Sequence, residues 1–368
     1  MTNLLSGLAT AESTDRYRKR FPAAAAGHFR QTLGVTIGSV RMGTYLGQPD
    51  AEADEAYAQT VVDAVASGCN VIDSAANYRF QRSERSIGDG LRRLSAKGFS
   101  REEIVLCTKG GYVPFDGDVP GHPPTYFTET FIKPGIAAPK DLVGGMHCMT
   151  PKYLMHQLDC SRKNMGVDKI DVYYIHNPET QLEAVSREEF YLRIRQAFES
   201  LERAASDGKI SSYGCATWNA FRMPPEADDH ISLQVLVQTA REIAGDSHRF
   251  KVVQLPFNLA MPEALVSPSQ EMDSKRISAL EAAQELGLTV FTSVPIFQGR
   301  LSYGLPAELH TRFPGISTDA QRAIQFVRSA PQVAAPLVGM SRKEHVRENL
   351  ELLRKPPLTP IEFGAFFK

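Results

Sequence analysis

Eight short apolar runs alternate along the chain with longer segments of mixed polarity. The runs are rich in β-branched residues, which is typical of strands. They lie at residues 39–43, 70–73, 104–109, 170–176, 210–216, 251–257, 289–294 and 333–339. Between them, segments such as residues 52–68 place apolar side chains at helical spacing, and Gly68 follows the last of these as a stop signal. The pattern therefore predicts strands that alternate with helices.

Strands that are apolar on both faces and separated by helices indicate a parallel sheet covered by helices. Eight such units favour an α/β fold of the (β/α)8 TIM-barrel type over an open doubly wound sheet. No G-x-G-x-x-G motif follows a predicted strand, which argues against a Rossmann domain. We expect one catalytic barrel domain at residues 33–355, with an N-terminal arm at residues 1–32 and a C-terminal tail at residues 356–368.

Two connections are longer than a minimal barrel needs. Residues 110–149 follow the third predicted strand, and residues 218–230 follow the fifth. Long connections of this kind usually carry function, and in a barrel they rise over the active-site face. We therefore expect long βα-loops that shape a binding site.

The composition narrows the class of protein. Of the 368 residues, 42% are hydrophobic and 23% are charged, as in a globular chain with a large core. The net charge of −1 gives no broad basic field for nucleic acid, and no apolar run approaches the length of a membrane span. Five cysteines without a C-x-x-C motif indicate neither disulfides nor a zinc site. We expect a cytoplasmic protein without a secretory signal, a bound metal, or a nucleic-acid or membrane partner.

Ionisable residues end three of the predicted strands. Asp73, Lys109 and His176 stand at the carboxyl ends of the second, third and fourth strands, and Tyr78 follows Asp73 by five residues. In a barrel these ends meet at one mouth. A phenol can give a proton to a carbonyl oxygen as hydride reaches its carbon, and a nearby ammonium lowers the phenol's pKa. We assign Tyr78 as the acid, Lys109 as its tuner, Asp73 as the anchor of Lys109, and His176 as the donor that orients the substrate oxygen.

These residues lie in motifs that resemble those of the aldo-keto reductases. In that family a strand-end aspartate is followed by tyrosine, glutamate and glycine at set spacings. The matching segments are "DSAANYRFQRSERSIGDGL" (residues 73–91), "TK" (108–109), "DVYYIHNP" (171–178), "QLPFN" (254–258) and "GMSRKEHVRENL" (339–350). The resemblance runs from about Leu33 to Leu353 and is specific as a set.

The resemblance implies an extended nicotinamide cofactor across the barrel mouth, NADP(H) in preference to NAD(H). Gly43 and Thr44 would approach it through backbone, Gln254 would hold its carboxamide, and Ser341 with Arg342 would face its adenosine end. The full set of implied cofactor contacts is Gly43, Thr44, Asp73, Thr217, Gln254, Ser293, Pro295, Gly299, Gly339, Ser341, Arg342, His345 and Asn349.

Three positions depart from the family pattern. Ala216-Thr217 stands where the family usually has Ser-Asn, so recognition of the carboxamide moves to Thr217 or Asn219. Ser293 stands where an aromatic residue commonly stacks on the nicotinamide, and Phe297 is the candidate substitute. His345 stands where many members place an arginine against the 2′-phosphate, which leaves NAD(H) as the alternative cofactor.

The predicted function is an NADP(H)-dependent oxidoreductase that moves hydride between the nicotinamide and a small carbonyl or alcohol: an aldehyde, a ketone or a keto sugar. Besides His176, the candidate walls of the substrate site are Tyr45, Tyr112, Phe115, Tyr126, Phe127 and Trp218. Aromatic walls suit a ring or sugar-like body. The aromatic residues of the long loop could equally form a small core of their own, and the sequence leaves open whether the chain forms an oligomer.

Two alternatives come from other classes of protein. A cofactor-binding, redox-sensing regulatory subunit would turn over little, but it would not need all four of Asp73, Tyr78, Lys109 and His176. A metal-dependent barrel hydrolase would need ligands that converge on a cation, and Lys109 would repel that cation.

Overall fold

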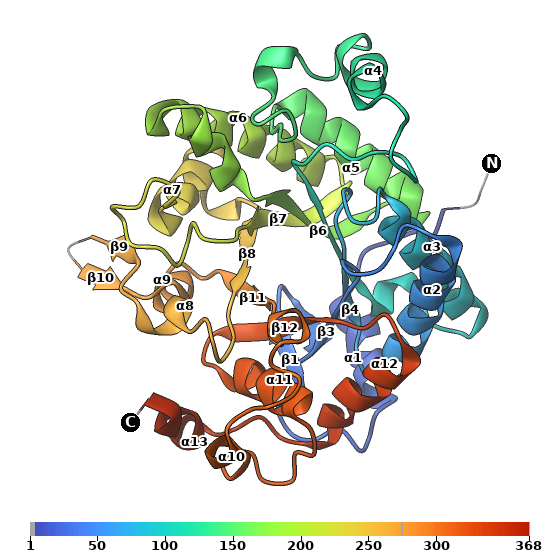
Figure 1. The fold of residues 1–368 in the computed structure, drawn as a ribbon, viewed down its shortest axis with the longest axis vertical. Helices are drawn as coiled ribbons and strands as arrows, with labels where there is room; N and C mark the ends of the chain where they lie inside the picture. The colour runs from blue at the N-terminus through green and yellow to red at the C-terminus, as the bar shows by residue number, and fades with distance from the viewer. Residues whose placement is uncertain (1–3, 274, 368) are drawn as a thin grey trace.

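Eight parallel strands close into a barrel in the computed structural model, which describes residues 4–273 and 275–367 (Figure 1). The order around the barrel is β11-β12-β3-β4-β5-β6-β7-β8. The strands are β3 (Arg41–Gly43), β4 (Val71–Asp73), β5 (Val105–Gly110), β6 (Ile170–His176), β7 (Ile210–Ala216), β8 (Phe250–Pro256), β11 (Thr289–Ser293) and β12 (Val333–Gly339). The predicted (β/α)8 fold and its eight strands are confirmed, with boundaries that differ by at most two residues.

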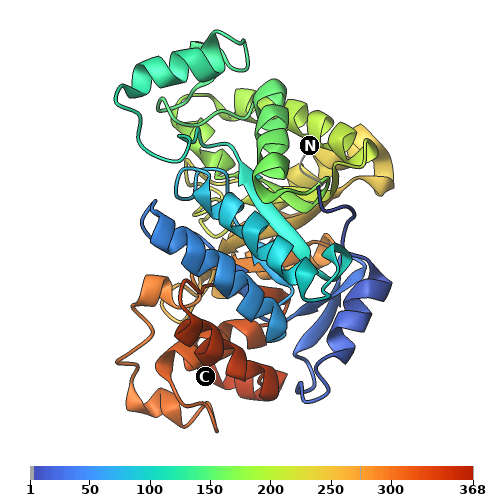
Figure 2. The same ribbon diagram turned by 90° about the vertical axis from the view of Figure 1, so that its right-hand side faces the viewer.

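Helices surround the barrel in both views (Figure 1, Figure 2). The main ones are α2 (Ala51–Ala66), α3 (Arg82–Ala96), α5 (Pro151–Met165), α6 (Arg187–Ser206), α7 (Leu233–Ala244), α9 (Ala279–Glu285), α11 (Asp319–Ser329) and α12 (Lys343–Leu350). In α2, the Asp50 side chain accepts a hydrogen bond from Ala53 N at the start of the helix, and Gly68 follows its end at a φ of 97°. That φ lies in the left-handed region where glycine carries no Cβ penalty, so Gly68 ends the helix as its position predicted.

Apolar side chains fill the barrel interior, so it is a packed core and not a pore. Val71, Val105, Val172, Val252 and Phe291, from five different strands, are all buried there. A second and larger core joins the outer faces of the strands to the surrounding helices. The packed interior leaves the mouth of the barrel as the place for a site. No helix among residues 4–273 and 275–367 is long and apolar enough to cross a membrane.

The segment before the barrel folds onto it. Helix α1 (Ala11–Lys19) is followed by an antiparallel hairpin of β1 (Phe29–Thr32) and β2 (Val35–Gly38), and Figure 2 shows this blue segment at one end of the barrel. The sequence pattern predicted no strand there, because the hairpin strands are short and one of them, "FRQT", is mostly polar. The expected boundary at residue 32 falls at the turn of this hairpin.

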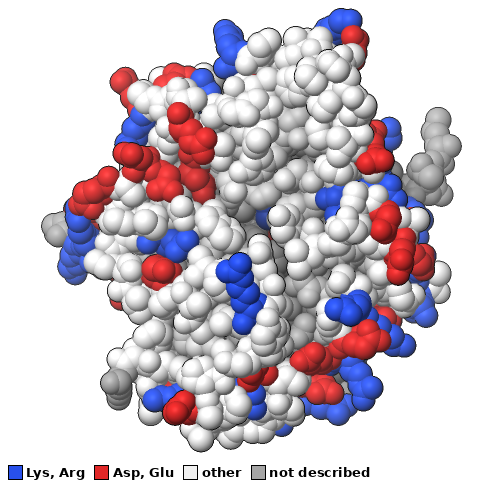
Figure 3. Space-filling view, in the orientation of Figure 1, with Lys and Arg blue, Asp and Glu red and all other residues white. Residues whose placement is uncertain are grey.

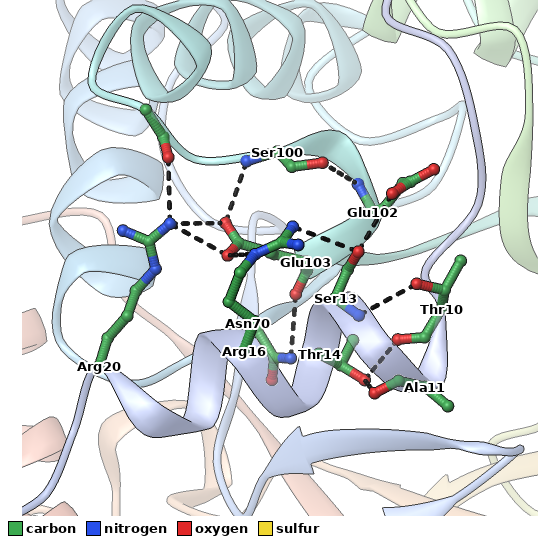
Figure 4. A network of polar contacts seen from close by, with 11 residues as sticks. Thr10, Ala11, Ser13, Thr14, Arg16, Arg20, Asn70, Ser100, Glu102 and Glu103 are labelled. Atoms are coloured by element: carbon green, nitrogen blue, oxygen red, sulfur yellow. Dashed lines mark hydrogen bonds and ion pairs between the residues drawn. The ribbon is translucent and has the colours of Figure 1, made fainter.

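Polar contacts fix α1 to the barrel (Figure 4). Arg16 and Arg20 form ion pairs with the buried Glu103 at 3.3 and 3.0 Å. The Asn70 side chain donates to the Glu103 carbonyl at 3.1 Å, and the Tyr17 hydroxyl donates to the Val65 carbonyl at 2.6 Å. The described part of the N-terminal arm therefore packs against the barrel domain.

The long connection after β5 carries short helices of its own. It contains α4 (Pro123–Phe127), η2 (Thr128–Ile132) and η3 (Pro139–Asp141), and α4 stands away from the barrel in both views (Figure 1, Figure 2). Its aromatic side chains pack against one another around the buried Phe131. The other described short elements are η1 (Arg101–Glu103), η4 (Pro178–Glu183), η5 (Gly245–Ser247), α8 (Glu263–Val266), β9 (Gln270–Met272), β10 (Lys275–Ile277), η6 (Phe297–Gly299), α10 (Ala307–His310), η7 (Glu351–Arg354), α13 (Pro360–Gly364) and η8 (Ala365–Phe367).

Candidate active site

A cavity of about 370 Å³ opens at the carboxyl ends of the strands. Figure 3 shows a hollow near the centre of this face, bordered mostly by uncharged residues. The predicted site residues that line the cavity are Gly43, Thr44, Tyr45, Tyr78, Lys109, Tyr112, His176, Thr217, Trp218, Gln254, Ser293, Pro295 and Gly339. The barrel thus brings together residues that are almost 300 positions apart in the chain.

Lys109 lies at the floor of the cavity between an acid and a phenol. Its Nζ forms an ion pair with Asp73 Oδ1 and donates to the Ser74 carbonyl at 2.7 Å. The same Nζ lies 5.1 Å from the centre of the Tyr78 ring. Lys109 and Asp73 are almost fully buried, so this charge pair is held away from bulk water. The structure therefore places the ammonium beside the phenol, as the expected proton transfer requires.

Burial and charge act on the pKa of Tyr78 in opposite directions. Burial raises it, the positive charge of Lys109 lowers it, and the net direction is upward. The lowering by Lys109 that the sequence argument expected is present, but burial, which that argument did not weigh, has the larger effect. A raised pKa keeps Tyr78 as the neutral phenol near neutral pH, which is the form that can donate a proton. Burial lowers the pKa of Lys109, but the charge of Asp73, the interaction with Tyr78 and the hydrogen bond to Asp73 together outweigh it, so the net pKa is raised and Lys109 stays a cation.

His176 reaches the cavity from the end of β6 as a neutral imidazole. Burial, with help from the charge of Lys109, holds its pKa well below the usual range. Its ring meets Tyr78 edge to face with 5.9 Å between the ring centres, and Tyr112 in the same way at 5.1 Å. A neutral ring with one N–H can donate a hydrogen bond to a substrate oxygen without adding charge to the site.

His147, a buried residue of the long loop, supports His176 and was not found from the sequence. Its Nε2 lies 2.7 Å from the His176 carbonyl, and the Gln181 Nε2 lies 2.8 Å from its Nδ1. Gln181 also accepts from Arg193 through Oε1, so its amide nitrogen is the atom that faces His147 and it can only donate. His147 therefore carries its proton on Nε2 and donates to the His176 carbonyl. This bond ties the loop to the end of β6.

Three residues that line the cavity have a buried polar atom without a partner among the described residues: Gln254 (Oε1), Thr217 (Oγ1) and His176 (Nδ1). The two oxygens among these atoms belong to Gln254 and Thr217. The Thr217 amide donates to the Gln254 carbonyl at 2.9 Å, so the two residues are held side by side. A carboxamide offers one donor group and one acceptor, which these two oxygens can satisfy. Asn219, the other candidate for this role, already accepts from Arg222 at 2.9 Å. The residues present therefore fit a nicotinamide ring, with Thr217 as the second contact.

The comparisons with known proteins decide the family. The family model described as "Aldo/keto reductase family" matches residues 36–239, more than half of the chain. The chain belongs to the aldo-keto reductase family. It is therefore an oxidoreductase.

Individual relatives of this aldo-keto reductase are distant. It is 27% identical to the D-threo-aldose 1-dehydrogenase of a Pseudomonas species over 358 residues, which cover 89% of this chain and 91% of the relative. It is 27% identical to the NADH-specific methylglyoxal reductase of Escherichia coli over 197 residues, 51% of each chain. Among solved structures, an aldo/keto reductase from Klebsiella pneumoniae in complex with NADP and acetate superimposes with a TM-score of 0.59 at 19% identity, covering 91% of this chain and 93% of that one.

The predicted adenosine-side residues of this aldo-keto reductase lie beyond the cavity, at and on α12. Arg342 immediately precedes the helix and is exposed, Ser341 and His345 are half-buried, and Asn349 is buried. Gly299 lies one residue beyond the cavity-lining Gln298. The structure does not bring this group into the catalytic cavity, which agrees with a cofactor that extends away from it.

The substrate side of the cavity differs from the expectation at three aromatic residues. Tyr45, Tyr112 and Trp218 line the cavity, but Phe115, Tyr126 and Phe127 pack within the long loop around its own core. The alternative interpretation of the loop aromatics is therefore correct for these three. Phe297 was the candidate to stack on the nicotinamide in place of Ser293. Its ring lies beneath the Arg300 guanidinium, 5.1 Å from the ring centre, and its neighbours Ile296 and Gln298 line the cavity.

Glu179, which the sequence did not single out, holds the Trp218 wall in place. Its buried Oε1 accepts from the backbone N–H groups of Trp218 at 2.6 Å and Asn219 at 3.3 Å. Burial raises the pKa of Glu179 to about 7. The position of one cavity wall thus depends on a carboxyl group that titrates near neutrality.

Glu179→Gln is expected to remove the part of the pH dependence of the unfolding free energy that comes from ionisation of the Glu179 carboxyl group. Because the folded-state pKa of about 7 exceeds the ordinary 4.5, the stabilisation is complete below pH 4.5 and is lost as the pH rises through about 7. Between these limits the unfolding free energy of the wild type should fall, relative to Glu179→Gln, by up to about 3 kcal/mol. Urea unfolding at several pH values measures this, and parallel pH profiles for the two proteins would contradict it.

Proposed function

We propose that this aldo-keto reductase transfers hydride between NADP(H) and a small carbonyl or alcohol, with Tyr78 as the proton donor and acceptor. One observation carries the proposal: the buried Lys109 ammonium, paired with Asp73, lies 5.1 Å from the centre of the Tyr78 ring on the floor of the cavity. This arrangement supplies a proton where a carbonyl oxygen would sit.

Each residue then has one task. Gln254 with Thr217 would hold the carboxamide of a nicotinamide, and that cofactor would supply the hydride when bound. Tyr78 gives its hydroxyl proton to the carbonyl oxygen, and Lys109 stabilises the phenolate that remains. The neutral His176 donates a hydrogen bond to the same oxygen and fixes its orientation. In alcohol oxidation the phenolate of Tyr78 takes the hydroxyl proton instead.

The choice of NADP(H) is supported by the relative from Klebsiella pneumoniae that was solved with NADP, and by the exposed cation of Arg342 beside α12. NAD(H) is the second candidate, because His345 replaces an arginine and one relative is named as NADH-specific. Arg342 and His345 are the residues we propose to face the 2′-phosphate.

Arg342→Ala is expected to raise the Kd for NADPH about 10- to 100-fold and to leave the Kd for NADH unchanged. A charge-assisted hydrogen bond to a phosphate contributes about 1.5–3 kcal/mol, and only NADPH carries the 2′-phosphate. Nicotinamide fluorescence titration measures both constants. Arg354→Ala, at an exposed arginine on η7 after the same helix, is the matched control. Equal losses of affinity for the two cofactors would argue against this role of Arg342.

For the substrate we propose an aldehyde, ketone or keto sugar of modest size. The cavity of about 370 Å³ is lined by the rings of Tyr45, Tyr112 and Trp218 and by the side-chain amides of Asn77 and Asn177. Aromatic faces and amide groups together suit a polyhydroxylated body. The relative named for D-threo-aldose supports the same class.

The experiment is NADPH consumption with a panel of aldehydes, ketones and keto sugars, and NADP+ reduction with the corresponding alcohols. Turnover with at least one class supports the proposal. Tight cofactor binding without turnover of any member would favour a redox-sensing regulatory subunit, the second candidate.

A further inference from the structure

The barrel interior contains a second buried cation in contact with Asp73. Arg41, the first residue of β3, is fully buried and lies among the side chains that fill the barrel. Its Nη1 donates to Asp73 Oδ2 at 3.1 Å, and its guanidinium carbon lies 4.3 Å from the centre of the Phe291 ring. Burial lowers the pKa of Arg41, but Asp73, with smaller contributions from Tyr174 and Cys107, raises it above its ordinary value, so the side chain remains charged.

Asp73 is therefore shared. Lys109 pairs with its Oδ1 and Arg41 with its Oδ2. Among residues 4–273 and 275–367, neither cation forms an ion pair with any other carboxylate. The other titratable groups that face Arg41 are Cys107 on β5 and Tyr174 on β6, and burial raises the pKa of both, so they are neutral. The group of Arg41, Asp73 and Lys109 thus carries one net positive charge.

The effect on Tyr78 follows from the signs of these charges. Lys109 favours the phenolate of Tyr78, while Asp73 disfavours it. A carboxylate with a single cationic partner would cancel most of the field that Lys109 exerts on the phenol. A second cation on the far oxygen of Asp73 offsets the carboxylate and leaves the charge of Lys109 effective.

We propose that Arg41 is a positioning residue that neutralises the far side of Asp73, so that the positive charge of Lys109 acts on Tyr78. The inference rests on the proposed proton transfer by Tyr78 and deepens it. Arg41 does not belong to the residues that line the cavity, so it acts through Asp73 and does not touch the substrate. The titratable groups around Tyr78 itself are Lys109, Asp73, Tyr45 and His176.

The test is the pH profile of kcat/KM for alcohol oxidation, which requires the phenolate of Tyr78. In Arg41→Gln the amide can keep a hydrogen bond to Asp73 but the charge is lost, so the apparent pKa should rise by about one pH unit. Arg41→Lys keeps the charge and should leave the profile near that of the wild type. A profile unchanged in Arg41→Gln, or shifted equally in Arg41→Lys, would overturn the proposal.

Arg101→Gln is the matched control. Arg101 forms a buried ion pair with Asp171 at 2.7 Å, and neither residue lines the cavity. Losing this pair should lower stability and leave the pH profile in place. Should Arg41→Gln fail to fold, Arg41→Met fills a similar volume without a buried amide and carries the same prediction.

A second readout does not depend on turnover. The tyrosinate absorbance of each protein minus that of its Tyr78→Phe counterpart isolates Tyr78 from the other tyrosines. In the Arg41→Gln background this difference should appear at higher pH than in the wild-type background. If Tyr78 titrates at the same pH in both backgrounds, the proposed role of Arg41 is wrong, whether or not a substrate is found. If the titration shifts but the protein turns over no substrate, Arg41 has the proposed role and the proposed function is wrong.

Discussion

Tyr78→Phe should lower the kcat for carbonyl reduction by about 10²- to 10⁴-fold, the range that a positioned proton donor contributes. The ring remains, so the packing against Tyr45, whose ring centre lies 4.9 Å away, is kept. Only the hydroxyl that faces Lys109 is lost. The Kd for NADPH should change little, because the proposed carboxamide contacts are on other strands. Steady-state kinetics with fluorescence titration of the cofactor measures both effects.

Tyr17→Phe is the control for this variant. Tyr17 is a fully buried tyrosine far from the cavity, and its hydroxyl donates to the Val65 carbonyl in the contact between α1 and the barrel. Losing that bond should reduce the unfolding free energy by about 1 kcal/mol and leave kcat unchanged. A Tyr78→Phe enzyme that keeps most of its activity would remove Tyr78 from the mechanism.

The second large effect is expected from Lys109→Met, which should lower kcat by about 10²-fold or more. Methionine has a similar length but no charge, so the phenolate of Tyr78 loses its nearest cation. Asp73 keeps Arg41 as a partner, so the variant does not leave a buried carboxylate unpaired and should fold. Lys109→Arg, which restores the charge, should recover part of the activity.

The pH profile separates a chemical from a structural role of Lys109. In alcohol oxidation, loss of the cation should move the apparent pKa of Tyr78 upward, so the limb that requires the phenolate moves to higher pH. Circular dichroism and cofactor binding report on folding in the same samples. A Lys109→Met enzyme with the wild-type profile and a kcat within a factor of about two would contradict the account.

The fold could be predicted from the sequence because each barrel strand lies in a short, mostly buried run that is separated from the next by a helical segment. The hairpin at residues 29–38 could not, since its strands are short and one is mostly polar. The four residues of the proposed proton transfer were found from strand ends and family motifs. Their convergence at one mouth is a consequence of barrel topology and needs no further information.

The residues that were missed depend on contacts between distant parts of the chain. Arg41 stands in an apolar run, and only the positions of Asp73 and Phe291 on other strands show that its charge is buried and paired. His147 and Glu179 are single polar residues whose partners lie far away in the sequence. The aromatic residues of the long loop could not be sorted into cavity walls and loop core, because that depends on how the loop folds.

The most direct test of the central claim is a single-turnover experiment on the wild-type protein loaded with NADPH and mixed with a substrate from the panel, with Tyr78→Phe alongside. The account predicts that the wild type rapidly oxidises one equivalent of bound NADPH, and that Tyr78→Phe binds the cofactor equally well but oxidises it at least about 10²-fold more slowly. Equal rates in the two proteins would contradict the account.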